Sequence, residues 1–345
     1  MQVFLNPVHA LHRGRHEMYR GRLVPCVEVP GRVEQVQAEL TRRGIGRFQA
    51  PADVDMQWLS RVHDVGYLQF LQSAWDDWLA LDPANAAFDL LPSVWPAPGM
   101  RRDRQSQELS ARVGLHAFDA GSPITAGTWA AARAGAGCAL SAARAVLAGE
   151  ASAFALTRPP GHHAGAAFYG GYCFLNNAAL AAQALRDAGL PRVAIVDVDY
   201  HHGNGTQSIF YERADVLTVS VHGDPRTEYP FYLGHADERG AGAGEGCNLN
   251  LPLPRGTGFD AWRPALQQGL QAVADFAPGA LVVSLGLDSF EADPISGFRL
   301  CSADYFCVGA DLRALGLPTV FVFEGGYAVA ALGVNAVNVL EGFLR

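Results

Sequence analysis

The stretch DVDYHHGNG, residues 197–205, directly follows the apolar run VAIV at residues 193–196. That run is rich in β-branched residues and apolar on both faces, which is typical of a strand buried inside a parallel sheet. It ends on Asp197, Asp199 and His201, although an unpaired charge in a buried position costs several kcal/mol. The pattern therefore indicates a binding site at the carboxyl end of a strand in an α/β protein.

Other short apolar runs also have the character of buried strands, and stretches of helical length separate them. The predicted strands are Val3–Leu5, Ala153–Leu156, Val193–Val196, Val216–Val221, Ala280–Leu285 and Thr319–Phe323. The predicted helices are 128–149, 176–189, 259–276, 303–316 and 330–344. This alternation predicts a doubly wound α/β fold with a mostly parallel central sheet and helices on both faces.

Length and composition bound the class of protein. The 345 residues are 49% apolar and 17% charged, which argues against disorder. Two domains would fit this length, and so would the single large domain over 1–345 that we expect. The formal net charge of −8 argues against a nucleic-acid binder and suits a small cationic or neutral partner.

Cysteine usage and the chain's first residues suggest the compartment. The six cysteines form no CxxC pair, which predicts buried, reduced thiols. The first residues lack the charged start and apolar core of a secretion signal, and no apolar run is long enough to span a bilayer. We therefore expect a cytoplasmic protein.

Residues 80–125 are expected to form a long irregular excursion between two helical regions. The part at 81–107 contains four prolines and shows little periodicity. Long loops in compact domains are usually functional, so a lid or an oligomer contact is favoured, with an inert insertion as the alternative.

Polar side chains also follow three other predicted strands. Asp288 follows one strand directly, and the sequence EGGY at the end of another places Tyr327 after two glycines that permit a tight turn. A third strand leads into TRPPGHHAG, which brings in His162 and His163. Because the carboxyl ends of parallel strands meet at one edge of a sheet, these side chains are expected to converge.

Asp199 and His201, together with one further carboxylate, require a compensating cation. Lys and Arg are absent from the sequence close to them, so a metal is the simplest partner. One imidazole and two carboxylates leave open coordination positions for water and substrate, as in a catalytic site. The alternative is that Asp199 caps a helix and His201 makes an ordinary hydrogen bond in the core.

Five motifs in order then resemble those of one known family. They are RPPGHHA, GGYCFLNNAA, DVDYHHGNGTQ, SLGLDSFEADP and EGGY. Together they resemble the histone deacetylase superfamily, and most closely its bacterial acetylpolyamine amidohydrolase branch. The resemblance extends over nearly the whole chain. It implies an arginase/deacetylase-like three-layer sandwich and the metal-dependent hydrolysis of an acetyl amide.

The resemblance also implies roles for residues at the strand ends. The implied zinc ligands are Asp199, His201 and Asp288, a set that equally suits Fe²⁺. The implied catalytic group is His162 paired with Asp197, His163 as general base and then acid, and Tyr327 as donor to the oxyanion. Asn204 stands where class I members have an Asp behind the second histidine. A structural K⁺ is implied at oxygens of Asp197, Asp199, His201, Ser220 and Val221.

Residues at the mouth are implied to select the substrate. Glu17, Glu108 and Asp119 match acidic rim positions, where carboxylates attract ammonium groups. Tyr172 and Tyr229 match aromatic positions that sandwich a methylene stem, and Gly171 would offer its carbonyl to the scissile N–H. Solvated surface charges and plain core packing are the alternatives.

The predicted function is therefore zinc-dependent deacetylation of acetylated polyamines or diamines, such as acetylputrescine and acetylcadaverine. The expected partners are this small cationic substrate and a second copy of the chain, held in a homodimer through the 80–125 excursion, with neither nucleic acid nor membrane. The main alternative is a broader acetyl-lysine or protein deacetylase of the class II type. A binuclear manganese hydrolase and a non-catalytic polyamine sensor are the others.

Overall fold

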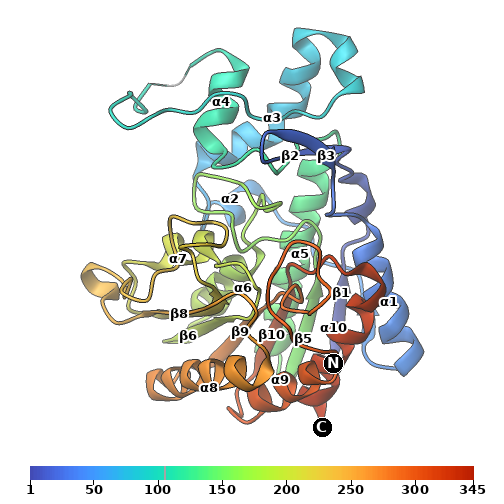
Figure 1. Cartoon of the computed structure of the whole chain (residues 1–345), viewed down its shortest axis with the longest axis vertical. Helices are drawn as coiled ribbons and strands as arrows, with labels where there is room; N and C mark the ends of the chain where they lie inside the picture. The colour runs from blue at the N-terminus through green and yellow to red at the C-terminus, as the bar shows by residue number, and fades with distance from the viewer. Residues whose placement is uncertain (105) are drawn as a thin grey trace.

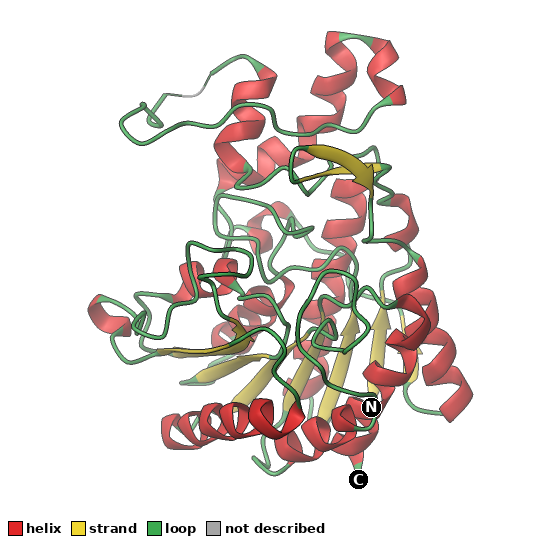
Figure 2. Cartoon of the chain, viewed as in Figure 1, coloured by secondary structure: helices red, strands yellow, loops and turns green. Residues whose placement is uncertain are grey.

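An eight-stranded parallel sheet forms the centre of the molecule (Figures 1 and 2). The structure is a computed structural model and describes residues 1–104 and 106–345. The strands, in the order in which they lie across the sheet, are β4 (Arg47–Gln49), β1 (Gln2–Leu5), β5 (Ser152–Leu156), β10 (Thr319–Phe323), β9 (Ala280–Leu285), β6 (Val193–Asp197), β7 (Val216–Gly223) and β8 (Asn248–Leu253).

Helices cover both faces of this sheet and complete a three-layer sandwich. The helices are α1 (Gly31–Arg43), α2 (Met56–Leu59), α3 (Val65–Leu81), α4 (Leu109–His116), α5 (Thr128–Leu147), α6 (Asn177–Asp187), α7 (Asn204–Phe210), α8 (Phe259–Phe276), α9 (Asp304–Arg313) and α10 (Val329–Leu344). Helices α3, α5 and α6 pack into the core on one face, and α1, α8, α9 and α10 into the core on the other.

Strand β6 shows why the sheet is apolar on both sides. Val193 and Ile195 belong to the core on the α5 side, whereas Ala194 and Val196 belong to the core on the α8 side. Because alternate residues of a strand point to opposite faces, a strand covered on both sides must be apolar throughout. The predicted fold class is confirmed, and this alternation explains the run that precedes Asp197.

All six predicted strands are present, but two strands at the edges of the sheet were not predicted. The edge strand β4 has the sequence RFQ with all three residues exposed, and β8 carries Asn at alternate positions. Neither has the continuous apolar run that marks a strand covered on both faces. The five predicted helices correspond to α5, α6, α8, α9 and α10, with ends shifted by no more than a few residues.

The 80–125 excursion is only partly irregular, so that prediction needs correction. It contains a 3₁₀ turn over Pro83–Ala87 and the helix α4, whose Leu109 and Val113 are buried in the core. The Met18 N–H of the hairpin formed by β2 (His16–Tyr19) and β3 (Arg22–Pro25) donates to Ala120 O at 3.1 Å. Hairpin and excursion lie together at the top of Figure 1, far from the two chain ends.

The prediction of buried thiols is wrong for part of the set. Cys138 and Cys173 are buried, but Cys301 is exposed because it lies in the turn before α9. Within residues 1–104 and 106–345 the cysteines are free thiols. Across the same residues, every helix is too short or too polar to cross a membrane.

The crossing of α9 and α10 depends on a glycine, which gives a test of the packing. A Cβ at Gly309 would lie 2.0 Å from Val339 O, whereas a Cβ at Gly258 would meet nothing within 4 Å. We expect Gly309→Ala to lower the free energy of unfolding by about 1–3 kcal/mol, the usual cost of overpacking. Gly258→Ala, which replaces the N-cap residue of α8 without a clash, should lower it by less than about 1 kcal/mol. Urea denaturation of both variants measures this, and equal losses would contradict the close helix crossing.

Candidate active site

The predicted functional side chains converge at the carboxyl ends of four neighbouring strands. Strands β5, β10, β9 and β6 lie side by side at the centre of the sheet. The loops that follow them carry His162, Tyr327, Asp288 and Asp199, respectively. Positions far apart in sequence are therefore brought together at the place where open α/β sheets bind their ligands.

Asp199, His201 and Asp288 form a compact, buried donor set. One ligand atom from each lies within 4.8 Å of the other two. The His201 Nδ1 atom lies 2.9 Å from Asp288 Oδ2 and 3.4 Å from Asp199 Oδ1. Two carboxylates and an imidazole at this spacing can coordinate one divalent ion while leaving positions for other ligands, so the residues present fit a catalytic metal.

The way this set is held differs from the sequence-based expectation. Extended backbone through Asp197, Asp199 and His201 was expected to point all three side chains the same way, but β6 ends at Asp197. The chain then bends, because the Asp199 N–H donates to Asp197 Oδ1 at 3.1 Å and the His201 N–H donates to Asp199 Oδ1 at 2.9 Å. Local side-chain to backbone hydrogen bonds of this kind compete with the strand conformation.

Two glycines allow the backbone to approach the Asp199 carboxylate. A Cβ at Gly286 would lie 2.1 Å from Asp199 Oδ2, and one at Gly325 would lie 2.4 Å from the same atom. The Gly325 N–H donates to this oxygen at 2.9 Å. Glycine at both positions therefore removes side chains from the space that the carboxylates occupy.

The charges in the set perturb one another strongly. Burial and the neighbouring Asp199 raise the pKa of Asp288 to about 7. Burial alone would lower the pKa of His201, but hydrogen bonds and charges from Asp199 and Asp288 outweigh it and raise that pKa to about 10. Such mutual perturbation is typical of functional sites, where several ionisable groups share a buried volume.

The tandem histidines have opposite electrostatic environments. His162 Nδ1 lies 2.9 Å from Asp197 Oδ2, whereas His163 Nδ1 lies 2.7 Å from the neutral amide oxygen of Asn204. Burial opposes the charge on His162, but the Asp199 and Asp197 carboxylates raise its pKa to about 10. Burial lowers the pKa of His163 well below its ordinary value, and the positive charges of His162 and His201 lower it further. The surroundings of the two imidazoles therefore shift their pKa values in opposite directions.

A buried arginine holds the loop that carries Tyr327, although no Arg was expected near the site. The Arg32 guanidinium is fully buried, donates to Gly326 O at 2.6 Å and lies over the Tyr327 ring, with Cζ 4.8 Å from its centroid. Its carboxylate partner is Glu28 at 2.8 Å, and among the described residues no hydrogen bond joins the guanidinium to Asp199 or Asp288. The expectation that no Arg lies near the site is therefore wrong in the folded structure, because Arg32 comes from a segment remote in sequence. The buried aspartates still need a further cation.

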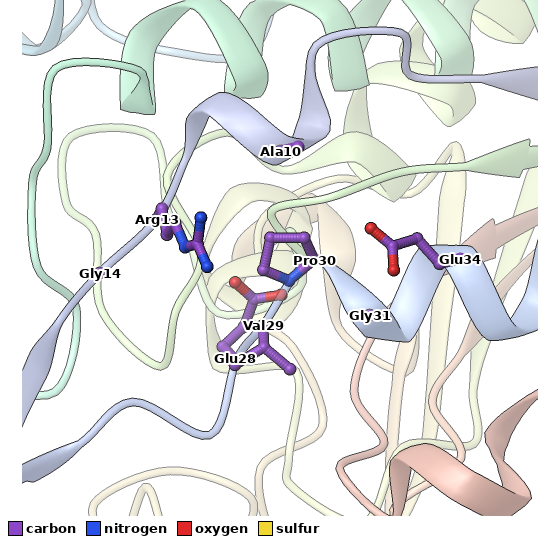
Figure 3. Close-up of a pocket in the computed structure, with 8 residues that line it drawn as sticks. All are labelled: Ala10, Arg13, Gly14, Glu28, Val29, Pro30, Gly31 and Glu34. Carbon is purple, nitrogen blue, oxygen red and sulfur yellow. The ribbon is translucent and has the colours of Figure 1, made fainter.

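Glu28 lies between two buried guanidinium groups at the edge of a cavity. Its Oε1 atom accepts from Arg32 at 2.8 Å and from Arg158 at 2.7 Å. Burial would raise the pKa of Glu28, but Arg158 and Arg32 outweigh burial and hold it below its ordinary value. Glu28 and Glu34 line this cavity of about 330 Å³ beside the first turn of α1, and in Figure 3 Glu28 lies between Arg13 on one side and Glu34 on the other. None of the predicted site residues lines it.

The predicted tunnel aromatics lie around the tandem histidines and Tyr327. The Tyr229 ring packs edge-on against His163, with centroids 5.1 Å apart, and the Tyr172 ring packs against Tyr327 at 5.5 Å. Gly171 and Tyr172 have φ of +54° and +66°, and a Cβ at Gly171 would lie 2.2 Å from His163 Cδ2. A tyrosine held at positive φ is unfavourable, and such strain is often found at functional sites.

The three predicted rim acids have different surroundings. Glu17 is buried on β2, where Oε1 accepts from the Tyr172 hydroxyl at 3.0 Å and Oε2 has no partner among the described residues. Asp119 Oδ2 accepts from Gly171 N at 2.8 Å and from the Tyr229 hydroxyl at 2.7 Å. Glu108 is exposed and caps α4 by accepting from Ser110 N at 2.6 Å. Of the three, Glu17 has the buried oxygen with spare acceptor capacity.

The predicted potassium ligands lie on the adjoining strands β6 and β7. Asp197 pairs with Ser220 in the parallel register of these strands, and Val221 follows on β7. A small cavity of about 10 Å³ lies against the Asp197 and Ser220 side chains. The structure thus gathers the predicted residues, and their role as ion ligands stays a prediction.

Several buried groups at the site were missed by the sequence analysis. They are Glu28, Arg32, Asp293 and the side chain of Glu324, whose Oε2 accepts from Gly161 N at 2.6 Å and from His162 N at 3.1 Å. The spacing of Glu28 and Arg32, four residues apart in EVPGR, is a weak signal of an ion pair. Asp293 and Glu324 lie inside motifs that were quoted, but the contacts of Asp293 with Tyr327 and of Glu324 with His162 join segments remote in sequence.

Comparison with known proteins identifies the family. A family model described as the histone deacetylase domain matches residues 26–343. The chain is 52% identical over 337 residues to acetylpolyamine amidohydrolase 2 of Pseudomonas aeruginosa, covering 97% of this chain and 96% of that protein. It is 45% identical to the acetylpolyamine amidohydrolase of Mycoplana ramosa, covering 99% of both chains.

A solved structure agrees with the sequence relatives. The crystal structure of an acetylpolyamine aminohydrolase from Burkholderia pseudomallei superposes with a TM-score of 0.94 at 41% identity, covering 99% of this chain and 98% of that one. The chain therefore belongs to the histone deacetylase family and is an enzyme of this hydrolytic deacetylase class. The predicted recognition, fold class and enzyme class are confirmed.

The pair of glutamates that lines the cavity in Figure 3 gives a test of the buried charge cluster. We expect Glu28→Gln to lower the free energy of unfolding by about 3–5 kcal/mol, because two buried guanidinium groups lose their counter-ion. The exposed Glu34→Gln is the matched control and should change it by less than about 0.5 kcal/mol.

The stability contributed by Glu28 is also expected to depend on pH. A carboxylate with a lowered folded-state pKa contributes stability above its unfolded pKa and loses it as the pH falls through the folded pKa. The stability gap between wild type and Glu28→Gln should therefore narrow in acid. A gap that does not change with pH in urea titrations would contradict the ion-pair account.

Proposed function

We propose that this chain is a zinc-dependent deacetylase that removes acetyl groups from acetylated polyamines and diamines. The observation that carries the proposal is the buried set of Asp199, His201 and Asp288, with ligand atoms within 4.8 Å of one another, beside the His162–His163 pair. The relatives named above as acetylpolyamine amidohydrolases match over nearly the full length of the chain. Together these support both the chemistry and the substrate class.

In this proposal Asp199, His201 and Asp288 hold the Zn²⁺, with Fe²⁺ as the alternative occupant. When bound, the ion acts as a Lewis acid toward water and the amide carbonyl. The neutral His163 accepts the proton of the attacking water at Nε2 and later donates it to the leaving amine, while Nδ1 stays on Asn204. The protonated His162, held by Asp197, stabilises the negative charge that develops nearby.

Tyr327 and Gly171 complete the proposed site. The Tyr327 hydroxyl donates to the oxyanion as the carbonyl carbon becomes tetrahedral. The Gly171 carbonyl accepts from the scissile N–H, and its peptide group is fixed by the Tyr172 N–H, which donates to Ser122 Oγ at 2.7 Å. The rings of Tyr172 and Tyr229 enclose the methylene stem of the substrate.

The acidic mouth supports a cationic substrate. We infer that Glu17, with its spare oxygen, attracts the free ammonium group of an acetylated diamine, aided by Asp119 and Glu108 through their charge. We also propose a structural K⁺ held by oxygens of the Asp197–Ser220 region, and a cytoplasmic location. A homodimer formed through the 80–125 excursion is supported by its exposed apolar residues Phe88, Val94, Trp95 and Met100.

Acetate release across a substrate panel tests the proposal. We expect acetylputrescine and acetylcadaverine to be hydrolysed with kcat/KM at least about tenfold above that of an acetyl-lysine peptide. A chelator should abolish release and added Zn²⁺ should restore it. A peptide preferred by tenfold would favour a protein deacetylase instead, and full activity after exhaustive chelation would contradict metal dependence.

The perturbed pKa of Glu17 leads us to expect that the preference for charged substrates depends on pH. Burial raises the pKa of Glu17 to about 7, so its negative charge increases as the pH rises through about 7. We expect the ratio of kcat/KM for acetylputrescine to that for N-acetylbutylamine, which is uncharged, to rise several-fold between about pH 6 and about pH 8. Taking the ratio removes the effect of enzyme groups whose titration changes the rates for both substrates equally. In Glu17→Gln the ratio should be lower and independent of pH, and an unchanged pH profile would exclude Glu17 from ammonium recognition.

A further inference from the structure

Asp293 is a buried carboxylate with no assigned role. It lies in the loop after β9, five residues beyond Asp288, and is 9% exposed. Its partners are backbone N–H groups. Oδ2 accepts from Tyr327 N at 2.6 Å and from Ala328 N at 3.2 Å, and Oδ1 accepts from Ile295 N at 3.1 Å. One side chain therefore connects the loop that carries Asp288 to the residue that carries the phenol.

The rest of the loop at 324–328 is anchored through other backbone groups. The Gly325 N–H donates to Asp199, and Leu287 N donates to Gly325 O at 3.0 Å. Arg32 donates to the carbonyls of Glu324 and Gly326. These contacts fix the peptides before Tyr327. Asp293 is the side chain that holds the N–H groups of Tyr327 and Ala328, at the point where the phenol leaves the backbone.

Holding three backbone N–H groups with a buried carboxylate has an energetic cost, because burial disfavours the charged form. Burial raises the pKa of Asp293, and the hydrogen bonds from Tyr327 and Ile295 work against that rise. An amide in its place offers a single acceptor oxygen, so whichever way it is turned its NH₂ group faces at least one of the three N–H donors. A near-isosteric Asn therefore keeps the volume but loses part of the anchor.

We propose that Asp293 is a positioning residue, which sets the direction of the Tyr327 side chain relative to the Asp288 loop and so acts on the reaction through the phenol. The inference rests on the proposed role of the Tyr327 hydroxyl. Small displacements of a reacting or stabilising group are costly in rate, because stabilisation of developing charge depends on fixed geometry. A purely structural role would instead lower stability without depending on the phenol.

A double-mutant cycle tests this. Acetate release from acetylputrescine is measured for wild type, Asp293→Asn, Tyr327→Phe and the double variant, with melting temperatures for each. We expect Asp293→Asn to lower kcat at least about tenfold with KM within about twofold. In the Tyr327→Phe background the same change should lower kcat less than about twofold, because the group through which it acts has been removed. Glu291→Gln, an exposed acid of the same loop, is the control and should keep wild-type kcat.

The outcomes separate the inference from the function on which it rests. If Tyr327→Phe loses at least about a hundredfold in kcat and the two losses multiply in the double variant, the positioning role is overturned while the proposed chemistry stands. If Tyr327→Phe keeps near wild-type turnover, the role of the phenol and the inference both fail. Should Asp293→Asn melt below the assay temperature, Asp293→Glu, which keeps the charge and both acceptor oxygens, is carried through the same cycle with the same criteria.

Discussion

The carboxylate of Asp199 is the constraint on which the site depends. It is fully buried and accepts N–H groups from His201 in its own loop and from Gly325 in the loop after β10. An ionised carboxylate in such a position is tolerated only when hydrogen bonds and a cation compensate for the lost water. The glycines at 286 and 325, the bend after β6 and the nearby imidazoles all follow from accommodating this one charge.

The hydrogen-bond donors that stabilise the buried carboxylates come partly from the backbone and partly from side chains. On the floor of the site, peptide N–H groups reach Asp197, Asp199, Asp288 and Asp293, so the carboxylates are fixed by the main chain. Of the predicted rim acids, Glu17 is bound by the Tyr172 hydroxyl, whereas Asp119 is bound both by the Tyr229 hydroxyl and by the Gly171 N–H. Side-chain partners can change by single substitutions, whereas backbone partners cannot. The Tyr172 contact with Glu17 can therefore be lost by one substitution, whereas the backbone contacts of the four floor carboxylates persist.

The sequence predicted the parts of this arrangement that are encoded locally. A strand covered on both faces is apolar throughout, so all six interior runs were recognised, and the polar residues expected to converge at their ends do lie close together. The edge strands β4 and β8 were missed because neither is apolar throughout: β4 is exposed and polar, and β8 carries asparagine at alternate positions. Arg32 was missed because its contact with Gly326 joins residues 294 positions apart, and no local pattern encodes such a pairing.

The three predicted rim acids show that residue type alone does not determine what a carboxylate can bind. Glu17, Glu108 and Asp119 were predicted as equivalent rim charges, but their surroundings differ. Glu17 is buried with one oxygen that has no partner among the described residues, Glu108 caps a helix, and Asp119 accepts from Gly171 and Tyr229. A carboxylate that already accepts several hydrogen bonds has less capacity for a ligand than one with an unpartnered oxygen, because each lone pair can be used once. What such a group can recognise is therefore decided by the donors that the fold places around it, and those donors come from loops that the sequence does not reveal to be neighbours.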